Sequence, residues 1–391
     1  MTILATPADG LAAARSLRPV LEQRAADHDR AGTFPVADFA DLRAAGLMGL
    51  MTPTRLDGAG AGFAQYAEVA MVLAEGNGAT ALVYNMHCSI TGALASLPDE
   101  LARVLGVPES YFAMRDRVLS AAARGGFYAV AMSERGSGSR LSGVSTTYEP
   151  RGREGYAIRG SKTFCSGAGH ADGYLVAARN GEVVSYFLVP AGLGITVEDT
   201  WDSLGMRATG SQDLHLDVLA PPDSLLGGVE GLTLLLAQVM PQWLVASYAA
   251  VYVGVAQSAI DHAVRHVQER DLGRLPAVRA RLGRADAQVA AARLVVLEAA
   301  RRVDADPGTP ETNRWIWRAK LAAGVTAMEV AASMLEAAGT SATRKGHPLE
   351  RIYRDARCGS LQPATSDVCA DWLGMTALGL DADGGSTVPR W

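Results

Sequence analysis

The sequence predicts an α+β protein of three consecutive parts: a helical domain over residues 1–122, a β domain over residues 123–227 and a helical bundle over residues 228–391. Three observations predict this order. Helix-compatible apolar spacing fills most of the first part, short β-like runs separated by turn residues follow Gly125, and the helical period returns after Gly227. The apolar pattern therefore changes its period twice, once at each border.

The first part is expected to consist of helices interrupted by one loop. Phe34-Pro35 opens a segment whose apolar residues recur at positions 36, 39, 42 and 45, roughly one face of a helix. Repeated glycines within residues 57–62 predict a loop, because glycine raises the entropic cost of any regular element. Residues 63–97 are again compatible with a helix, broken near Gly76-Asn77-Gly78.

The middle part carries four β-like runs, at residues 127–132, 174–178, 183–189 and 214–218. In the last run, apolar Leu214, Leu216 and Val218 alternate with polar His215 and Asp217, as expected of a half-buried strand. Two consecutive prolines at 221–222 close this part. We expect a β domain that ends there.

The last part shows two long apolar stripes with alternating steps of three and four residues. One stripe occupies positions 282, 285, 289, 292 and 296, and the other positions 321, 325, 328, 332 and 335. Such stripes are typical of antiparallel helices that pack in a bundle.

Composition excludes several classes of function. The 391 residues are 49% hydrophobic, enough to bury large cores, and the net charge of −5 has the wrong sign for a general nucleic-acid binder. The four cysteines have no metal-binding spacing, and we interpret them as reduced thiols of a cytoplasmic protein. The N-terminus lacks the features of a signal peptide, and the longest apolar run, residues 244–256, is shorter than the ~20 residues needed to cross a bilayer.

Three motifs point to a known family. They are Met132-Ser-Glu-Arg-Gly-Ser-Gly-Ser-Arg140, Ile158-Arg-Gly-Ser-Lys-Thr-Phe-Cys-Ser-Gly-Ala168 and Leu204-Gly-Met-Arg-Ala-Thr-Gly-Ser211. In order and spacing the chain resembles the acyl-CoA dehydrogenase superfamily. The resemblance implies a helical N-terminal domain, a central β-barrel or sandwich domain and a C-terminal four-helix bundle. It also implies a flavin cofactor, expected to be FAD, with FMN or a diffusible reduced flavin as alternatives.

The resemblance also assigns the flavin contacts of the middle domain. By position, Met132 and Ser133 would contact the flavin ring, and the hydroxyl of Ser139 lies in the same segment. Phe164 would lie beside the ring and Ser166 near its N5 atom. Taken singly, the first segment also fits an ordinary Gly/Ser turn, and Phe164 also fits a packed strand residue.

Further assignments fall in the last part. Residues 348–357 are close to a conserved charged segment of the family, in which we expect Arg354 and Asp355 to be structural. Thr365 matches a hydroxyl residue near the cofactor's phosphates or adenine, although it also fits a helix N-cap. Arg270 would reach a phosphate or else end a solvated helix. The family's glycine-rich adenosine segment keeps only Gly339, which predicts a weaker or differently built grip on the cofactor.

The glutamate that removes the substrate proton in many family members is missing. Pro363 occupies its usual position, and Leu244 lies near the alternative position used by some members. As substitutes we consider Asp367 first, because it lies one helical turn beyond Pro363. His87 is the second candidate base, with a packed, hydrogen-bonded histidine as its structural interpretation.

Two chemistries follow from these residues. We favour the α,β-dehydrogenation of an acyl thioester, bound to CoA or a carrier protein, with a relocated base and an electron-transfer partner. The alternative is a monooxygenase or N-hydroxylase of the same fold, which takes reduced flavin from a partner reductase and needs no such base. A flavin-binding scaffold without catalysis is the third hypothesis. The family's cofactor site is completed between subunits, so we expect a homodimer or homotetramer.

Overall fold

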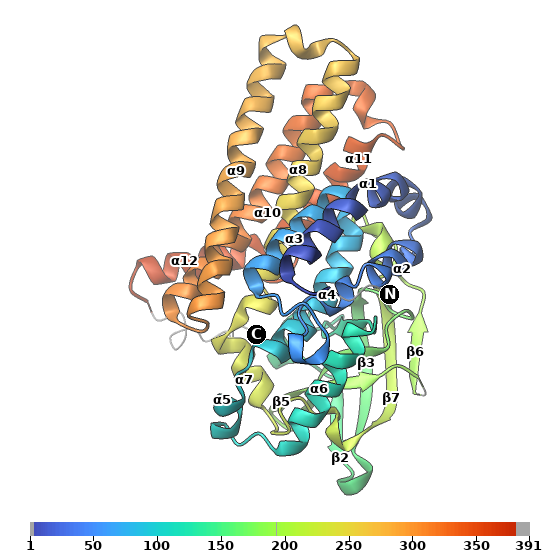
Figure 1. Ribbon diagram of the computed structural model, residues 1–391, viewed down its shortest axis with the longest axis vertical. Coiled ribbons are helices and arrows are strands. Elements are labelled where there is room, and N and C mark those ends of the chain that lie inside the picture. Colours follow the sequence, from blue (N-terminus) through green and yellow to red (C-terminus); the bar gives the residue numbers. More distant parts are fainter. Residues whose placement is uncertain (1–3, 193, 381–391) are drawn as a thin grey trace.

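The computed structural model describes residues 4–192 and 194–380, and it confirms the predicted fold class. In Figure 1 the long helices α8 (Ala246–Glu269), α9 (Pro276–Ala305) and α10 (Pro310–Ala338) form a bundle at one end of the molecule and the β-sheet lies at the other end. Most of the N-terminal helices lie between them. The three parts of the chain therefore meet at the N-terminal helices.

Six helices precede the sheet: α1 (Pro7–Ala31), α2 (Val36–Ala44), α3 (Phe63–Gly76), α4 (Gly78–Ser96), α5 (Asp99–Val104) and α6 (Glu109–Ala123). The predicted break between α3 and α4 is a single residue, Asn77, whose side-chain oxygen caps α4 by accepting a hydrogen bond from the Ala79 N–H at 3.1 Å. Nearly all of α4 is buried, which makes it the central helix of the N-terminal part.

The middle part is one mixed sheet of seven strands: β1 (Tyr128–Ala131), β2 (Thr147–Pro150), β3 (Tyr156–Cys165), β4 (Gly173–Asn180), β5 (Val183–Pro190), β6 (Ile195–Glu198) and β7 (Gln212–Ala220). The strand order is β1-β4-β2-β3-β7-β6, and β5 pairs with β4. The four predicted β-like runs correspond to β1, β4, β5 and β7. The short strands β2 and β6 are mostly exposed, so their sequences carry little apolar signal.

The last part contains α7 (Leu232–Val239), α8 (Ala246–Glu269), α9 (Pro276–Ala305), α10 (Pro310–Ala338), α11 (Pro348–Arg357) and α12 (Ser366–Ala377). The predicted stripe on α9 is buried from Ala285 to Val296. On α10 the predicted stripe is only half-buried, and the core side of the helix is formed by its small neighbours, among them Ala323 and Ala327. The apolar surface of α10 is therefore wider than the part of it that packs against the rest of this chain.

Two described helical segments, Pro241–Glu269 and Pro310–Ala338, are long and apolar enough to span a membrane by length and composition alone. In the first, 83% of the most apolar window is buried inside the protein, and in the second 44%. Burial against other helices accounts for the apolar character of the first segment, which contains α8.

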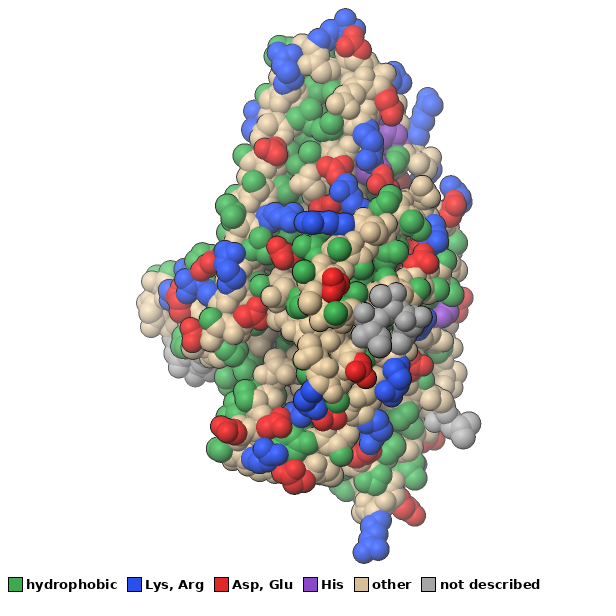
Figure 2. All heavy atoms as spheres, viewed as in Figure 1, with side chains coloured by type: hydrophobic (Ala, Val, Ile, Leu, Met, Phe, Trp, Pro, Cys, Tyr) green, Lys and Arg blue, Asp and Glu red, His purple; other side chains and the backbone are tan. Residues whose placement is uncertain are grey.

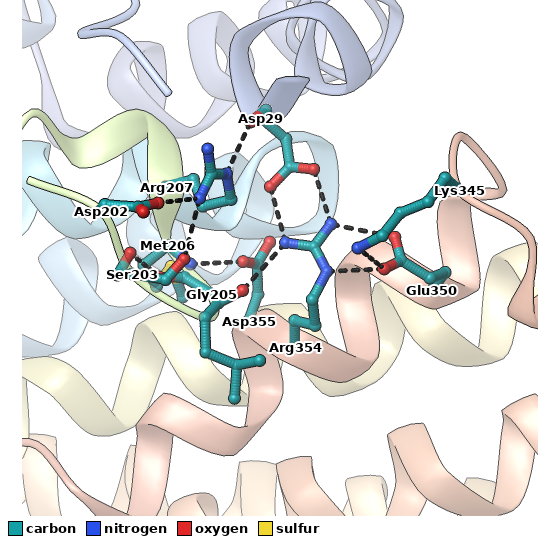
Figure 3. A network of polar contacts seen from close by, with 11 residues as sticks. Asp29, Asp202, Ser203, Gly205, Met206, Arg207, Lys345, Glu350, Arg354 and Asp355 are labelled. Carbon is teal, nitrogen blue, oxygen red and sulfur yellow. Dashed lines mark hydrogen bonds and ion pairs between the residues drawn. The ribbon is translucent and has the colours of Figure 1, made fainter. Parts of the chain in front are cut away.

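Charged residues of α11 join the three parts of the chain (Figure 3). Arg354 donates hydrogen bonds to Asp29 of α1, at 2.9 and 2.6 Å, and to Glu350, one turn earlier on α11. The carboxylate of Asp355 accepts the Met206 N–H, at 2.5 Å, from the loop that precedes β7. Burial raises the pKa of Asp355 to about 6. These contacts support the structural role expected for Arg354 and Asp355.

Candidate functional site

The first predicted flavin segment is held in place by a buried ion pair. The carboxylate of Glu134 accepts a hydrogen bond from Lys162 of β3 at 2.7 Å, and it also accepts from the backbone and hydroxyls of Ser145 and Thr146. Burial alone would raise the pKa of Glu134, but these hydrogen bonds outweigh it and lower the pKa to about 2. The pair fixes the segment that begins at Met132 against β3.

Phe164 lies where β3 departs from regular geometry. The pairing of β3 with β7 shifts register between Lys162 and Cys165, and Phe164 has a positive φ of 56°. Its neighbour Cys165 is fully buried, whereas Phe164 is 62% exposed and its ring meets that of Trp201 edge-on. A bulky residue in this conformation is strained, and a β-bulge can re-aim a side chain beside a site. The outward aromatic ring fits a contact with a planar cofactor.

A chain of hydroxyl groups begins at Ser166, two residues after Phe164. The Ser166 Oγ and Ser211 Oγ are 2.8 Å apart, and the Ser211 Oγ lies 2.6 Å from the Thr209 Oγ1. Three hydroxyls carry three protons, and two hydrogen bonds within the chain use two of them. One proton is left for an acceptor other than these three hydroxyls. Ser166 is the least buried of the three residues. This arrangement suits the expected contact of Ser166 with a flavin nitrogen.

An apolar cavity of about 150 Å³ opens beside Met132, the first residue of the flavin segment. Its walls come from α4, α6, β1, β4, β5, α7, the first turn of α8 and the 3₁₀ turn η7 (Pro241–Trp243). Most lining residues are aliphatic or aromatic, and none of the described lining residues is an aspartate, glutamate, histidine, lysine or arginine. Leu244, near one of the family's glutamate positions, lines the cavity.

The cavity nevertheless contains buried polar groups. The hydroxyl of Tyr186 and the side-chain oxygen of Gln242 are both buried, and neither makes a hydrogen bond within the described part of the chain. Sequence patterns missed both residues. Tyr186 resembles a core residue of β5, and Gln242 lies in a turn between two helices, so neither belongs to a motif.

His87 is fully buried on α4, and both of its ring nitrogens are occupied. The Tyr128 N–H donates to Nδ1 at 3.2 Å, and Nε2 is 2.8 Å from the Met48 carbonyl oxygen, to which it donates. The ring is therefore neutral, and burial lowers its pKa to about 4. His87 is not among the residues that line the cavity. Its contacts match the structural interpretation rather than that of a free base.

The predicted residues near the C-terminus lie around the start of α12. The Thr365 hydroxyl caps this helix by accepting the Val368 N–H at 3.3 Å, as the N-cap interpretation expects. Asp367 is exposed in the first turn of the helix. Neither Asp367 nor Pro363 lines the apolar cavity.

Two predicted cofactor contacts lie on the surface. Ser139 is exposed in the loop after Glu134, and Arg270 is exposed at the C-terminal end of α8. The structure thus places Met132 and Ser133 beside β3, with the Ser133 carbonyl accepting the Thr163 N–H at 2.8 Å, while Ser139 and Arg270 project outward.

Comparison with known proteins finds matches along the whole chain. Acyl-CoA dehydrogenase N-terminal, middle and C-terminal domain profiles match residues 12–102, 129–219 and 243–375. L-evernosamine nitrososynthase of Micromonospora sp. is 33% identical, covering 93% of this chain and 89% of that protein. Putative acyl-CoA dehydrogenase YdbM of Bacillus subtilis is 28% identical, covering 91% of this chain and 93% of that protein.

A similar solved structure is that of a KijD3 in complex with FMN and dTDP-3-amino-2,3,6-trideoxy-4-keto-3-methyl-D-glucose. It superposes with a TM-score of 0.82 at 28% sequence identity, covering 96% of this chain and 95% of that chain. The proteins similar to this chain thus include both nitrososynthases and dehydrogenases.

Proposed function

This chain belongs to the acyl-CoA dehydrogenase superfamily of flavin-dependent oxidoreductases, and from that premise we propose that it is a flavin-dependent monooxygenase of a small uncharged molecule. The observation that carries the proposal is the lack of any acidic or basic side chain among the described residues that line the apolar cavity. Removal of a substrate proton needs a base within hydrogen-bond reach, directly or through one water.

The sequence favoured dehydrogenation, whereas we now favour oxygenation. The reason is the position of the two candidate bases. Dehydrogenation would require Asp367 or His87 to approach a substrate in the cavity. Asp367 is exposed on α12, and both nitrogens of His87 are bonded to the backbone. Oxygenation makes no such demand on either residue.

The residues around Phe164 and Ser166 would hold the flavin, as FAD or as FMN. When bound in its reduced form, the flavin would supply the electrons that activate oxygen. Phe164 would cover the cofactor with its exposed ring, and Ser166 would donate the spare proton of the hydroxyl chain. The apolar walls would keep water away from the reacting atoms. A flavin reductase is the partner that this chemistry requires.

Anaerobic titration tests the proposal against dehydrogenation. Protein loaded with FAD, and separately with FMN, is mixed with butyryl-CoA and longer acyl thioesters, and the flavin absorbance is followed. We expect no bleaching, and after chemical reduction we expect oxygen to be consumed. Bleaching by a thioester that disappears in Asp367→Asn or in His87→Asn, with the flavin retained, would instead establish a dehydrogenase and identify its base.

A further inference from the structure

Three of the residues that line the apolar cavity carry a buried polar group with no partner in the described part of the chain: the Tyr186 hydroxyl, the Gln242 amide oxygen and the Trp243 indole N–H. The Tyr186 hydroxyl and the Gln242 amide oxygen line the cavity, and each residue is more than nine-tenths buried. Buried polar groups are nearly always hydrogen-bonded, and leaving one unpaired is costly. An unpaired hydroxyl and an unpaired amide on one cavity therefore point to a ligand that pairs with them.

The fold holds both side chains in fixed positions on different walls. Tyr186 lies in the middle of β5, where its N–H donates to the Thr233 hydroxyl at 3.1 Å and its carbonyl accepts the Leu226 N–H at 2.9 Å. Gln242 lies in η7, and the next residue of this turn, Trp243, packs its ring against that of Phe63, with the ring centroids 4.7 Å apart. A ligand in this cavity would share it with both groups, and most of the side chains around its body are aliphatic or aromatic.

The size of the cavity limits that body to about one ring. Its volume is about 150 Å³. An apolar cavity of about this volume is known to bind benzene. Met132 lines the same cavity, so a ring placed there would lie next to the predicted flavin contacts.

The cavity also selects against charge. None of its described lining residues is ionised at neutral pH, since its tyrosines keep their protons; burial raises the pKa of Tyr186 far above the usual range. A carboxylate or ammonium group would lose its hydration here without gaining an opposite charge. The ligand must therefore be neutral in the part that enters the cavity.

We infer that the cavity binds an uncharged aromatic ring that carries one hydroxyl or amino substituent, with Tyr186 and Gln242 as the specificity-determining residues. A neutral hydroxyl can accept from the Tyr186 hydroxyl and donate to the Gln242 oxygen. The assignment of this ring as the oxygenated substrate rests on the proposed function, whereas its binding does not.

Calorimetric titration of the oxidised, flavin-loaded protein tests the inference with three probes of similar size: phenol, benzene and benzoate. We expect phenol to bind about tenfold more tightly than benzene, because a hydrogen bond to a neutral group contributes about that factor, and benzoate not to bind. Tyr186→Phe and Gln242→Met should each remove most of the preference for phenol and leave the benzene affinity unchanged.

Tyr252→Phe is the matched control. The Tyr252 hydroxyl is also buried and unpaired within the described part of the chain, but Tyr252 does not line the cavity. The Tyr252→Phe variant should bind phenol, benzene and benzoate with the same affinities as the wild type. Equal affinities for phenol and benzene, tight benzoate binding, or a phenol preference that survives in both variants would each overturn the inference. Because no reductant is present, the oxidised flavin cannot activate oxygen, and these outcomes are independent of whether the protein is an oxygenase.

Discussion

His87 is held between two backbone groups, and this sets how the protein responds to acid. Its pKa in the folded protein is lowered to about 4 by burial, below the ordinary value of 6.5. The unfolded chain therefore binds a proton that the folded chain does not, and stability falls as the pH falls from 6.5 towards 4. Asp355 acts in the opposite direction, because its pKa is raised to about 6 by burial.

Comparison of wild type with His87→Asn isolates this contribution, because Asp355 titrates in both proteins. We expect the unfolding free energy of the wild type to fall more between neutral pH and pH ~5, by roughly 1–2 kcal/mol beyond the change in the variant. Urea denaturation at each pH measures the difference. Parallel pH profiles in the two proteins would show that His87 is not buried as a neutral ring.

Ser166 carries the second prediction at the scale of single residues. Ser166→Ala removes the least buried of the three linked hydroxyls, which belong to Ser166, Ser211 and Thr209. We expect flavin affinity to fall by about five- to tenfold, the effect of one hydrogen bond. Fluorescence titration with FAD and FMN measures it. Ser16→Ala, which removes an exposed hydroxyl of α1, serves as the control. An equal loss of flavin affinity in both variants would exclude a specific contact between Ser166 and the flavin.

Among the elements, α11 joins the N-terminal helices to the loop before β7. The side chain of Arg354 is only 10% exposed and forms ion pairs with both Asp29 and Glu350. We call this set of contacts the α11 junction. Removing one partner from a buried charge network leaves the other charges unpaired. We expect Arg354→Ala to lower the unfolding free energy by about 3–5 kcal/mol in chemical denaturation.

Lys345 provides the matched control for this junction. It binds the same Glu350, at 2.8 Å, but its side chain is 83% exposed. Exposed ion pairs contribute about 0–1 kcal/mol, so Lys345→Ala should have little effect. An equal loss of stability in both variants would show that the burial of Arg354 contributes nothing. The contacts of Figure 3 would then not hold the three parts together.

At the scale of the whole molecule, α10 presents apolar side chains that one chain only half covers. Leu321, Val325 and Met328 lie on this half-buried stripe. In Figure 2 hydrophobic side chains are visible between the charged ones along the bundle. Apolar side chains that a chain leaves only half covered are typical of a face that packs against another chain. We therefore propose that the protein is a homo-oligomer that uses this face of the bundle.

Light scattering after gel filtration tests the oligomer. We expect the wild type to have the mass of a dimer or tetramer at micromolar concentration. Met328→Glu, which places a charge on the stripe, should shift the mass towards that of the monomer, because burying an unpaired charge is costly. Glu329→Gln on the neighbouring exposed position is the control. A monomeric wild type would contradict the proposal, as would a Met328→Glu variant whose mass is unchanged.

The sequence alone determined the features that depend on neighbouring residues. The three-part order followed from apolar periods, and the segments around Met132 and Phe164 were recognised because their residues are consecutive. The break near Gly76-Asn77-Gly78 was predicted from consecutive residues in the same way, whereas the cap that Asn77 forms on α4 came only from the structure. The α10 stripe was only half predictive, because an apolar period shows that a face is apolar but not which helix or which chain covers it.

Only the tertiary structure decided which groups share the cavity. Tyr186 from β5 and Gln242 from η7 are far apart in the chain, and no local pattern links a strand tyrosine to a turn glutamine. The same holds for His87, a candidate base by residue type, whose two nitrogens are bonded to Met48 and Tyr128. The chemistry of a buried group depends on partners that folding brings from distant segments, and the sequence around it does not contain them.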